Sequence, residues 1–219
     1  MLLEHWHDRW RRNEIGFHQD TVNPYLIRYW SRLGLGPGDP VFVPLCGKSR
    51  DMRWLHDQGH PVLGVEVSPI AVQGFFAEHG LQPQPFHAAP FEGWASDGMK
   101  ILCGDFFALT PKHVAGTRGV YDRASLIALS AEDRRRYADH LIKLIHPPAQ
   151  VLLVTLDYPP GEMTGPPFAV TEKEVRGLYG QHFSIQLLES CKVLDENPRF
   201  RDKGLTRLEE AVYLMTPRQ

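Results

Sequence analysis

Charged side chains stand at the ends of short apolar runs in this sequence. Glu66 closes one run, Asp105 follows the next, and Asp122 and Arg123 end a third. If these runs are parallel strands, their carboxyl ends meet at one edge of the sheet, where open α/β sheets bind their ligands. We therefore expect a ligand site at that edge.

Glu66 has the spacing of a sugar-binding carboxylate. It follows Gly47 by 66 − 47 = 19 residues. This matches the offset of about 20 residues at which an acidic side chain accepts hydrogen bonds from a ribose diol. The alternative is a solvated carboxylate at a strand end. Its position after the first strand-to-helix turn favours the ribose interpretation.

The turn before Glu66 argues against a phosphate-bearing ligand. Residues 44–49 read Pro-Leu-Cys-Gly-Lys-Ser, which ends like a phosphate loop, but Phe42 stands where that loop needs glycine. The sequence also lacks GxGxxG, the tight turn that receives the pyrophosphate of NAD or FAD. A nucleoside ligand without phosphates fits better.

The other strand ends each allow two interpretations. Asp105 can accept a hydrogen bond from an adenine amine while Phe106 lies against the ring, or the two can be a turn Asp and a core Phe. A buried Arg123 needs a partner, which either the adjacent Asp122 or a ligand carboxylate can provide, or Asp122 and Arg123 can form a plain surface ion pair.

Metal and serine chemistry are not indicated. His56 and His60 are four residues apart, but Gly59 interrupts the helix that would hold both rings on one face, and no HExxH is present. Ser125 lies outside any GxSxG elbow. We predict neither a metal site nor a dedicated catalytic side chain.

The elements that would position these residues follow an alternating pattern. Apolar runs alternate with helix-like segments as far as residue 156, and the last two runs have no long helical pattern between them, so they can pair as an antiparallel edge. The prediction is an α/β fold with a doubly wound, mainly parallel, seven-stranded sheet and an antiparallel edge strand. The expected strands are 40–45, 61–67, 100–103, 119–121, 150–156, 183–189 and 209–215.

The first 38 residues precede this pattern. They contain two short helical segments, one with Trp6 and Trp10 four residues apart and one that Asn23 can cap. Aromatic stripes of this kind are more often packing than a lid, but their separation from the sheet segments makes a helical cover over the site the expectation for residues 1–38.

Composition restricts the class of protein. The chain has 219 residues, which is consistent with a single domain, and a net charge of −2, which does not favour nucleic acid or an anionic membrane as a partner. No stretch reaches the roughly 18 apolar residues of a membrane span. The three cysteines form no CxxC, as expected for a cytoplasmic protein.

With these residues assembled, the sequence resembles the thiopurine S-methyltransferases nearly from end to end. The turn Pro-Leu-Cys-Gly-Lys together with Asp-Arg is the specific combination. The segments that carry the resemblance are 6–10 (Trp-His-Asp-Arg-Trp), 16–19 (Gly-Phe-His-Gln), 43–49, 59–66, 121–124 (Tyr-Asp-Arg-Ala), 137–139 (Tyr-Ala-Asp) and 165–168 (Gly-Pro-Pro-Phe).

The resemblance implies a class I, Rossmann-like methyltransferase fold and S-adenosylmethionine as cofactor, with S-adenosylhomocysteine as product. It also implies a monomer. It places the ribose contact on Glu66 and an acceptor-pocket aromatic on Phe17. The remaining cofactor positions that it implies are Trp10, Leu45, Asp105, Phe106 and Arg123.

The function implied is methyl transfer to the sulfur of a small aromatic or heterocyclic thiol, such as a thiopurine. Heteroaromatic thiols ionise readily, so a general base is not required. Methylation of selenium or tellurium species for detoxification stays open. From other classes, an NAD-linked oxidoreductase and a noncatalytic adenosine-binding module are the alternatives.

Overall fold

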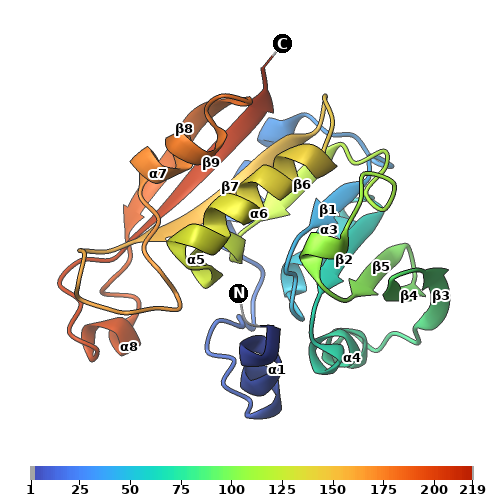
Figure 1. The fold of residues 1–219 in the computed structure, drawn as a ribbon, viewed down its shortest axis with the longest axis horizontal. Coiled ribbons are helices and arrows are strands. Elements are labelled where there is room, and N and C mark those ends of the chain that lie inside the picture. Colours follow the sequence, from blue (N-terminus) through green and yellow to red (C-terminus); the bar gives the residue numbers. More distant parts are fainter. Residues whose placement is uncertain (1–2, 219) are drawn as a thin grey trace.

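A nine-stranded sheet organises residues 3–218, the part of the chain that the computed structural model describes (Figure 1). All seven predicted strands are present, with bounds that differ by a few residues. The strands are β1 (Val41–Val43), β2 (Val62–Glu66), β3 (Gln84–Ala88), β4 (Phe91–Ser96), β5 (Met99–Cys103), β6 (Gly119–Asp122), β7 (Gln150–Asp157), β8 (Phe183–Lys192) and β9 (Glu209–Pro217).

The strand order places a topological switch at β1. The sheet runs β3-β4-β5-β2-β1-β6-β7-β9-β8, and the five strands β5, β2, β1, β6 and β7 are parallel. From β1 the chain goes to β2 on one side and later returns to β6 on the other. The crevice beyond β1 is therefore where a doubly wound sheet binds its ligand. The predicted fold class is confirmed.

Two strands were not predicted, so the sheet has nine strands rather than seven. β3 and β4 form an antiparallel pair that extends the sheet beyond β5. Most of β3 is exposed, and Pro85 and Gly93 interrupt the two segments. An exposed edge hairpin of this composition lacks the apolar run that identified the other strands.

The carboxyl-terminal edge is antiparallel, as predicted. β9 pairs with β7 on one side and with β8 on the other, so the last strand of the chain is inserted before the edge. The connection from β8 to β9 contains the short helix α8 (Pro198–Arg201). In Figure 1, α8 lies beyond the same edge of the sheet as the amino-terminal helix α1 (Leu3–Arg11).

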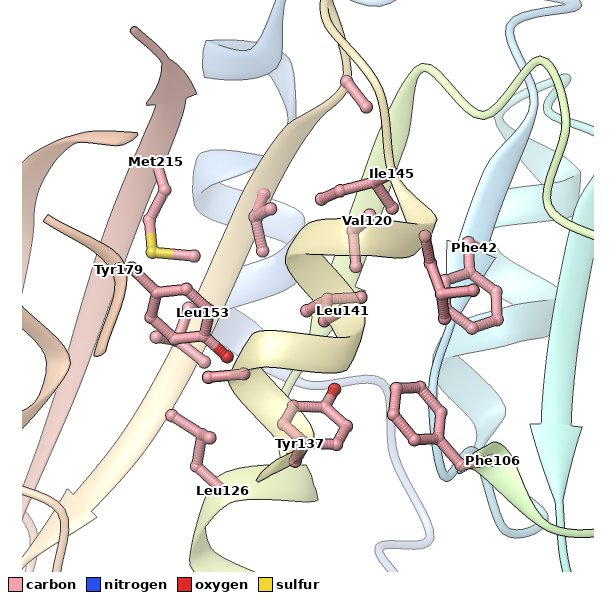
Figure 2. Packing of buried hydrophobic residues seen from close by; sticks show 14 of the residues in the cluster. Phe42, Phe106, Val120, Leu126, Tyr137, Leu141, Ile145, Leu153, Tyr179 and Met215 are labelled. Atoms are coloured by element: carbon pink, nitrogen blue, oxygen red, sulfur yellow. The ribbon is translucent and has the colours of Figure 1, made fainter. Parts of the chain in front are cut away.

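The helices cover both faces of the sheet because the residues of each central strand alternate. Phe42 faces a core that includes Tyr137 and Leu141, whereas Val41 and Val43 face the opposite core. Figure 2 shows the first of these cores, with Tyr137 and Leu141 lying against residues of the sheet. The remaining helices are α2 (Pro24–Tyr29), α3 (Arg50–Asp57), α4 (Pro69–Glu78), α5 (Ser125–Ala128), α6 (Ala131–Leu144) and α7 (Glu172–Tyr179), with short 3-10 helices η1 (Trp30–Leu33) and η2 (Phe106–Ala108).

The expected cover over residues 1–38 divides into two parts. α2 begins after Asn23, whose side chain accepts from the N–H groups of Tyr25 and Leu26. Leu26 and Trp30 are buried against the sheet, so α2 and η1 belong to the core. Only the segment that precedes them is placed to act as a cover. Residues 1 and 2 lie outside the described part.

Candidate active site

A cavity of about 340 Å³ opens at the carboxyl ends of the parallel strands. The first turn after β1, the end of β2, the residues after β6 and the end of β7 form its floor, and α1 and the α8 region flank it. Five of the seven predicted site residues line it: Trp10, Phe17, Leu45, Glu66 and Arg123.

Glu66 is a buried carboxylate whose two oxygens are both engaged by the backbone. Oε2 accepts from the Gly47 N–H at 2.9 Å and Oε1 from the Ser68 N–H at 2.8 Å. Burial raises the pKa of Glu66 above its ordinary value, and these two hydrogen bonds oppose the shift. Each oxygen keeps a lone pair for a second donor, so the fixed carboxylate can still accept from a pair of hydroxyls.

The first turn brings its backbone close to the cavity. Leu45 has φ of 45° and Gly47 has φ of 54°, and a left-handed conformation is costly for Leu but not for Gly. A Cβ atom at residue 47 would lie 3.3 Å from the Trp10 ring. Glycine at this position therefore lets Trp10 of α1 pack directly on the turn that Glu66 holds.

Arg123 is held by a partner that the sequence did not reveal. Its Nε donates to Asp51 Oδ2 at 2.9 Å, and the two side chains are 17% and 2% exposed. The same oxygen accepts from the Tyr121 hydroxyl at 3.1 Å, and Oδ1 accepts from the Asn23 N–H at 2.8 Å. Asp51 therefore links the cover segment, the sheet and Arg123.

Asp122, one of the partners that the sequence left open for Arg123, does not hold it. Asp122 Oδ2 accepts from the Tyr137 hydroxyl at 2.7 Å, and Oδ1 accepts from the Ser125 N–H at 3.2 Å. Successive residues of a strand point to opposite faces, which separates the Asp122 side chain from its neighbour in sequence. The sequence did not single out Asp51, because an Asp in the first turn of a helix is usually exposed to solvent and interacts with the helix dipole.

Asp105 and Phe106 do not line the cavity. Asp105 Oδ1 accepts from the Phe107 N–H at 3.0 Å and so caps η2. Phe106 is 2% exposed, and its ring centroid lies 4.7 Å from that of Tyr137. Figure 2 shows the two rings beside each other. The interpretation as a turn Asp beside a core Phe describes these contacts, and their role toward a ligand stays a prediction.

Aromatic side chains and an arginine of the amino-terminal segment line one side of the cavity. Phe17 lies edge-on to both Trp10 and Trp6, with ring centroids 5.5 and 5.8 Å apart. The guanidinium carbon of Arg9 lies 5.7 Å from the ring centroids of Trp6 and Phe17. The predicted stripe of Trp6 and Trp10 is thus both packing and part of the cavity wall.

Glu210 is a further lining residue that the sequence did not single out. It stands near the start of β9, and burial raises its pKa against the opposing effects of the Tyr25 hydroxyl and the Arg123 charge. Its neighbour Glu209 makes the segment read as an ordinary acidic strand start, so no sequence signal marked it.

The histidine pair predicted not to bind metal is split by the fold. His60 Nε2 accepts from the Trp30 indole N–H at 3.0 Å, and Nδ1 lies 3.0 Å from the Asp39 carbonyl oxygen. In residues 3–218 no three His, Cys, Asp or Glu side chains are grouped as metal ligands. None of the helices in this range is long and apolar enough to span a bilayer.

With this geometry in place, comparison with known proteins identifies the family. The family model described as Thiopurine S-methyltransferase matches residues 1–218. The chain belongs to the thiopurine S-methyltransferase family. A relative of that name from Nitrosospira multiformis is 53% identical over 218 residues, covering 100% of this chain and 99% of the relative. One from Azotobacter vinelandii is 52% identical and is covered over its full length.

Solved structures confirm the fold. A 1,6-didemethyltoxoflavin-N1-methyltransferase from Burkholderia thailandensis has a TM-score of 0.64 at 15% identity, with 98% of this chain and 87% of that one covered. A SAM-dependent methyltransferase from Anabaena variabilis has a TM-score of 0.64 at 12% identity, with 100% and 96% covered. The predicted resemblance to thiopurine S-methyltransferases and the class I methyltransferase fold are both confirmed.

Proposed function

We propose that this enzyme transfers the methyl group of S-adenosylmethionine to the sulfur of a small aromatic or heterocyclic thiol, of which a thiopurine is one example. The observation that carries the proposal is the Glu66 carboxylate, which lines the cavity at the end of β2 and is fixed there by two backbone hydrogen bonds. Family membership over residues 1–218 supports the reaction class.

The residues present fit S-adenosylmethionine. A buried carboxylate beside the β1 switch point suits a ribose diol, and the left-handed turn at Leu45 and Gly47 lets a ligand approach the backbone. The absence of a phosphate loop from the sequence is consistent with S-adenosylmethionine, because this ligand carries no phosphate. Arg123 and Trp10, two further residues expected to contact the cofactor, also line the cavity.

When bound, S-adenosylmethionine supplies a methyl group on a positively charged sulfur. The protein contributes by orienting the two reactants and by excluding water from the cavity. Trp6, Trp10 and Phe17 close one side of the cavity with apolar surface. Arg123 is fixed by Asp51 and lines the cavity, where it can orient the carboxylate of the cofactor or the acceptor. Orientation of two reactants in a dry site is worth about 7 to 11 kcal/mol of barrier.

A dedicated base is unnecessary for such acceptors. Aromatic thiols ionise more readily than alkyl thiols, and the thiolate is the nucleophile. A cavity that excludes water would suit a cationic methyl donor and an anionic acceptor, because their opposite charges attract more strongly where water is excluded. We also propose that the enzyme acts as a monomer in the cytoplasm, which fits its three free cysteines.

The test is transfer of labelled methyl from S-adenosylmethionine to a panel of thiopurines and thiophenols, preceded by calorimetric titration of the cofactor. Binding followed by labelled thioether supports the proposal. Binding without any methylated product would indicate a noncatalytic adenosine-binding module. Inorganic selenium and tellurium species belong in the same panel, and titration with NADH tests the oxidoreductase alternative.

A further inference from the structure

The outer part of the cavity wall carries a surplus of positive charge. Arg9 on α1, together with Arg199 and Lys203 in the α8 region, lines the cavity. Within residues 3–218, no carboxylate lies within 4.0 Å of any of these three cations. A chain with a net charge of −2 has therefore gathered unpaired cations at one opening.

The other cations of the cavity are already paired. Lys48 forms an ion pair with Glu78, and Arg123 forms one with Asp51. The carboxylates that line the cavity, Glu66 and Glu210, belong to the floor at the ends of β2 and β7–β9 rather than to α1 or α8. Among the charged side chains that line the cavity, the surplus of positive charge therefore comes from α1 and the α8 region.

Internal contacts do not account for this charge. Arg9 donates to the Glu14 carbonyl oxygen at 3.1 and 2.9 Å, and Arg199 donates to the Gly16 carbonyl oxygen. The guanidinium carbon of Arg199 lies 4.8 Å, and the Lys203 ammonium 5.9 Å, from the Phe200 ring centroid. Carbonyl and ring contacts orient cations but leave the full charge uncompensated.

The methyl donor cannot pair with all three of these cations. S-adenosylmethionine has one carboxylate, one ammonium and one sulfonium, so it brings a net positive charge to the cavity. Its carboxylate can pair with one cation, and at least two of Arg9, Arg199 and Lys203 then remain. A cavity that binds a cationic cosubstrate gains nothing from further cations unless the second substrate is an anion.

We propose that the acceptor is an aromatic thiol that bears a separate anionic group, a carboxylate or a phosphate, which the cations of α1 and α8 receive. This inference rests on the proposed function and narrows its substrate class. The aromatic rings of Phe17 and Phe200 beside these cations suit the ring of such an acceptor. Arg199 and Lys203 are exposed at the opening, so they also attract the anion before it enters.

The experiment compares 4-mercaptobenzoate with its methyl ester at a pH where both thiols are fully ionised. The carboxylate is expected to have the higher kcat/KM at low salt, and added salt is expected to reduce that preference. Lys203→Gln should lower kcat/KM for the carboxylate by about two- to fivefold, mainly through KM, and lower it less for the ester. Lys203→Arg should restore the preference.

A matched control and a binding measurement complete the test. Lys173 is exposed on α7, away from the cavity lining, so Lys173→Gln should leave the preference intact. Calorimetry with 4-(methylthio)benzoate, the expected product, should show tighter binding than with its methyl ester. An ester equal to or better than the carboxylate, or equal effects of Lys203→Gln on both, would overturn the inference alone. Cofactor binding with no methylation of either thiol would overturn it together with the proposed function.

Discussion

At the scale of single residues, Glu66 affects both cofactor binding and folding stability, and the two effects depend on pH in opposite directions. Its carboxylate form accepts the Gly47 and Ser68 N–H groups and the proposed diol. Burial raises its pKa, so it takes up a proton at a higher pH than an ordinary glutamate. Cofactor affinity should therefore weaken as the pH falls through this raised pKa.

The contribution of Glu66 to folding stability changes with pH in the opposite direction to cofactor affinity. A raised folded-state pKa means that its contribution to stability is greatest below the unfolded pKa and is lost as the pH rises through the folded pKa. Calorimetric titration of the cofactor across pH, beside urea unfolding, distinguishes the two trends. Glu66→Gln should weaken binding by about 1 to 3 kcal/mol and flatten its acid dependence. A variant that binds as the parent does would refute the diol contact.

Asp51 is the second residue whose role can be tested. Asp51→Asn removes the charge that holds Arg123 but keeps the size of the side chain. We expect a loss of about 1 to 3 kcal/mol in unfolding free energy and a lower kcat with a smaller change in cofactor affinity. Arg123→Lys should also lower kcat, because Lys cannot keep the Nε contact while presenting terminal N–H groups to the cavity. If kcat survives both changes, Arg123 does not act at the acceptor.

At the scale of elements, the sequence predicted the strands that apolar runs and turn residues identify. Apolar runs located β1, β2, β5, β6 and β7, and their order put Glu66 and Arg123 at the same edge. The β3–β4 hairpin was not predicted because β3 is mostly exposed and Pro85 and Gly93 interrupt the apolar pattern of the two strands. The Asp51–Arg123 pair joins positions 72 residues apart, and nothing local to either position identifies such a partner.

Two glycines make a matched test of how α3 packs on the sheet. A Cβ at Gly64 in β2 would lie 2.6 Å from Cys46 Sγ and 2.9 Å from Met52 Cε, whereas a Cβ at Gly177 in α7 meets nothing within 4 Å. Gly64→Ala should cost about 1 to 3 kcal/mol and weaken cofactor binding by shifting the first turn. Gly177→Ala should stabilise by about 0.5 to 1 kcal/mol, because it removes an exposed helix glycine. Urea unfolding measures both, and equal effects would contradict this packing.

At the scale of the whole molecule, the segment after α1 and the α8 region meet beside the cavity. Arg199 reaches the Gly16 carbonyl oxygen, and Trp10 rests on the Gly47 turn. The cover itself is weakly anchored, since α1 has nine residues and Trp10 is its one buried side chain within the described range. A helix this short is not stable alone in water. It should therefore open locally at a lower free energy than α6, which contributes Tyr137 and Leu141 to the core.

Ligand binding should couple this local opening to global stability. S-adenosylhomocysteine at about 100 times its Kd should raise the unfolding free energy by about 2.7 kcal/mol, because it binds the folded state alone. Hydrogen exchange should then slow in α1 and in residues 12–22, with α6 changing little because it is already protected. Trp10→Ala should remove the slowing in α1 while leaving the exchange of α6 as in the parent. An α1 segment that exchanges as slowly as α6 without ligand would show that the cover is a fixed wall, and cofactor entry would then need another route.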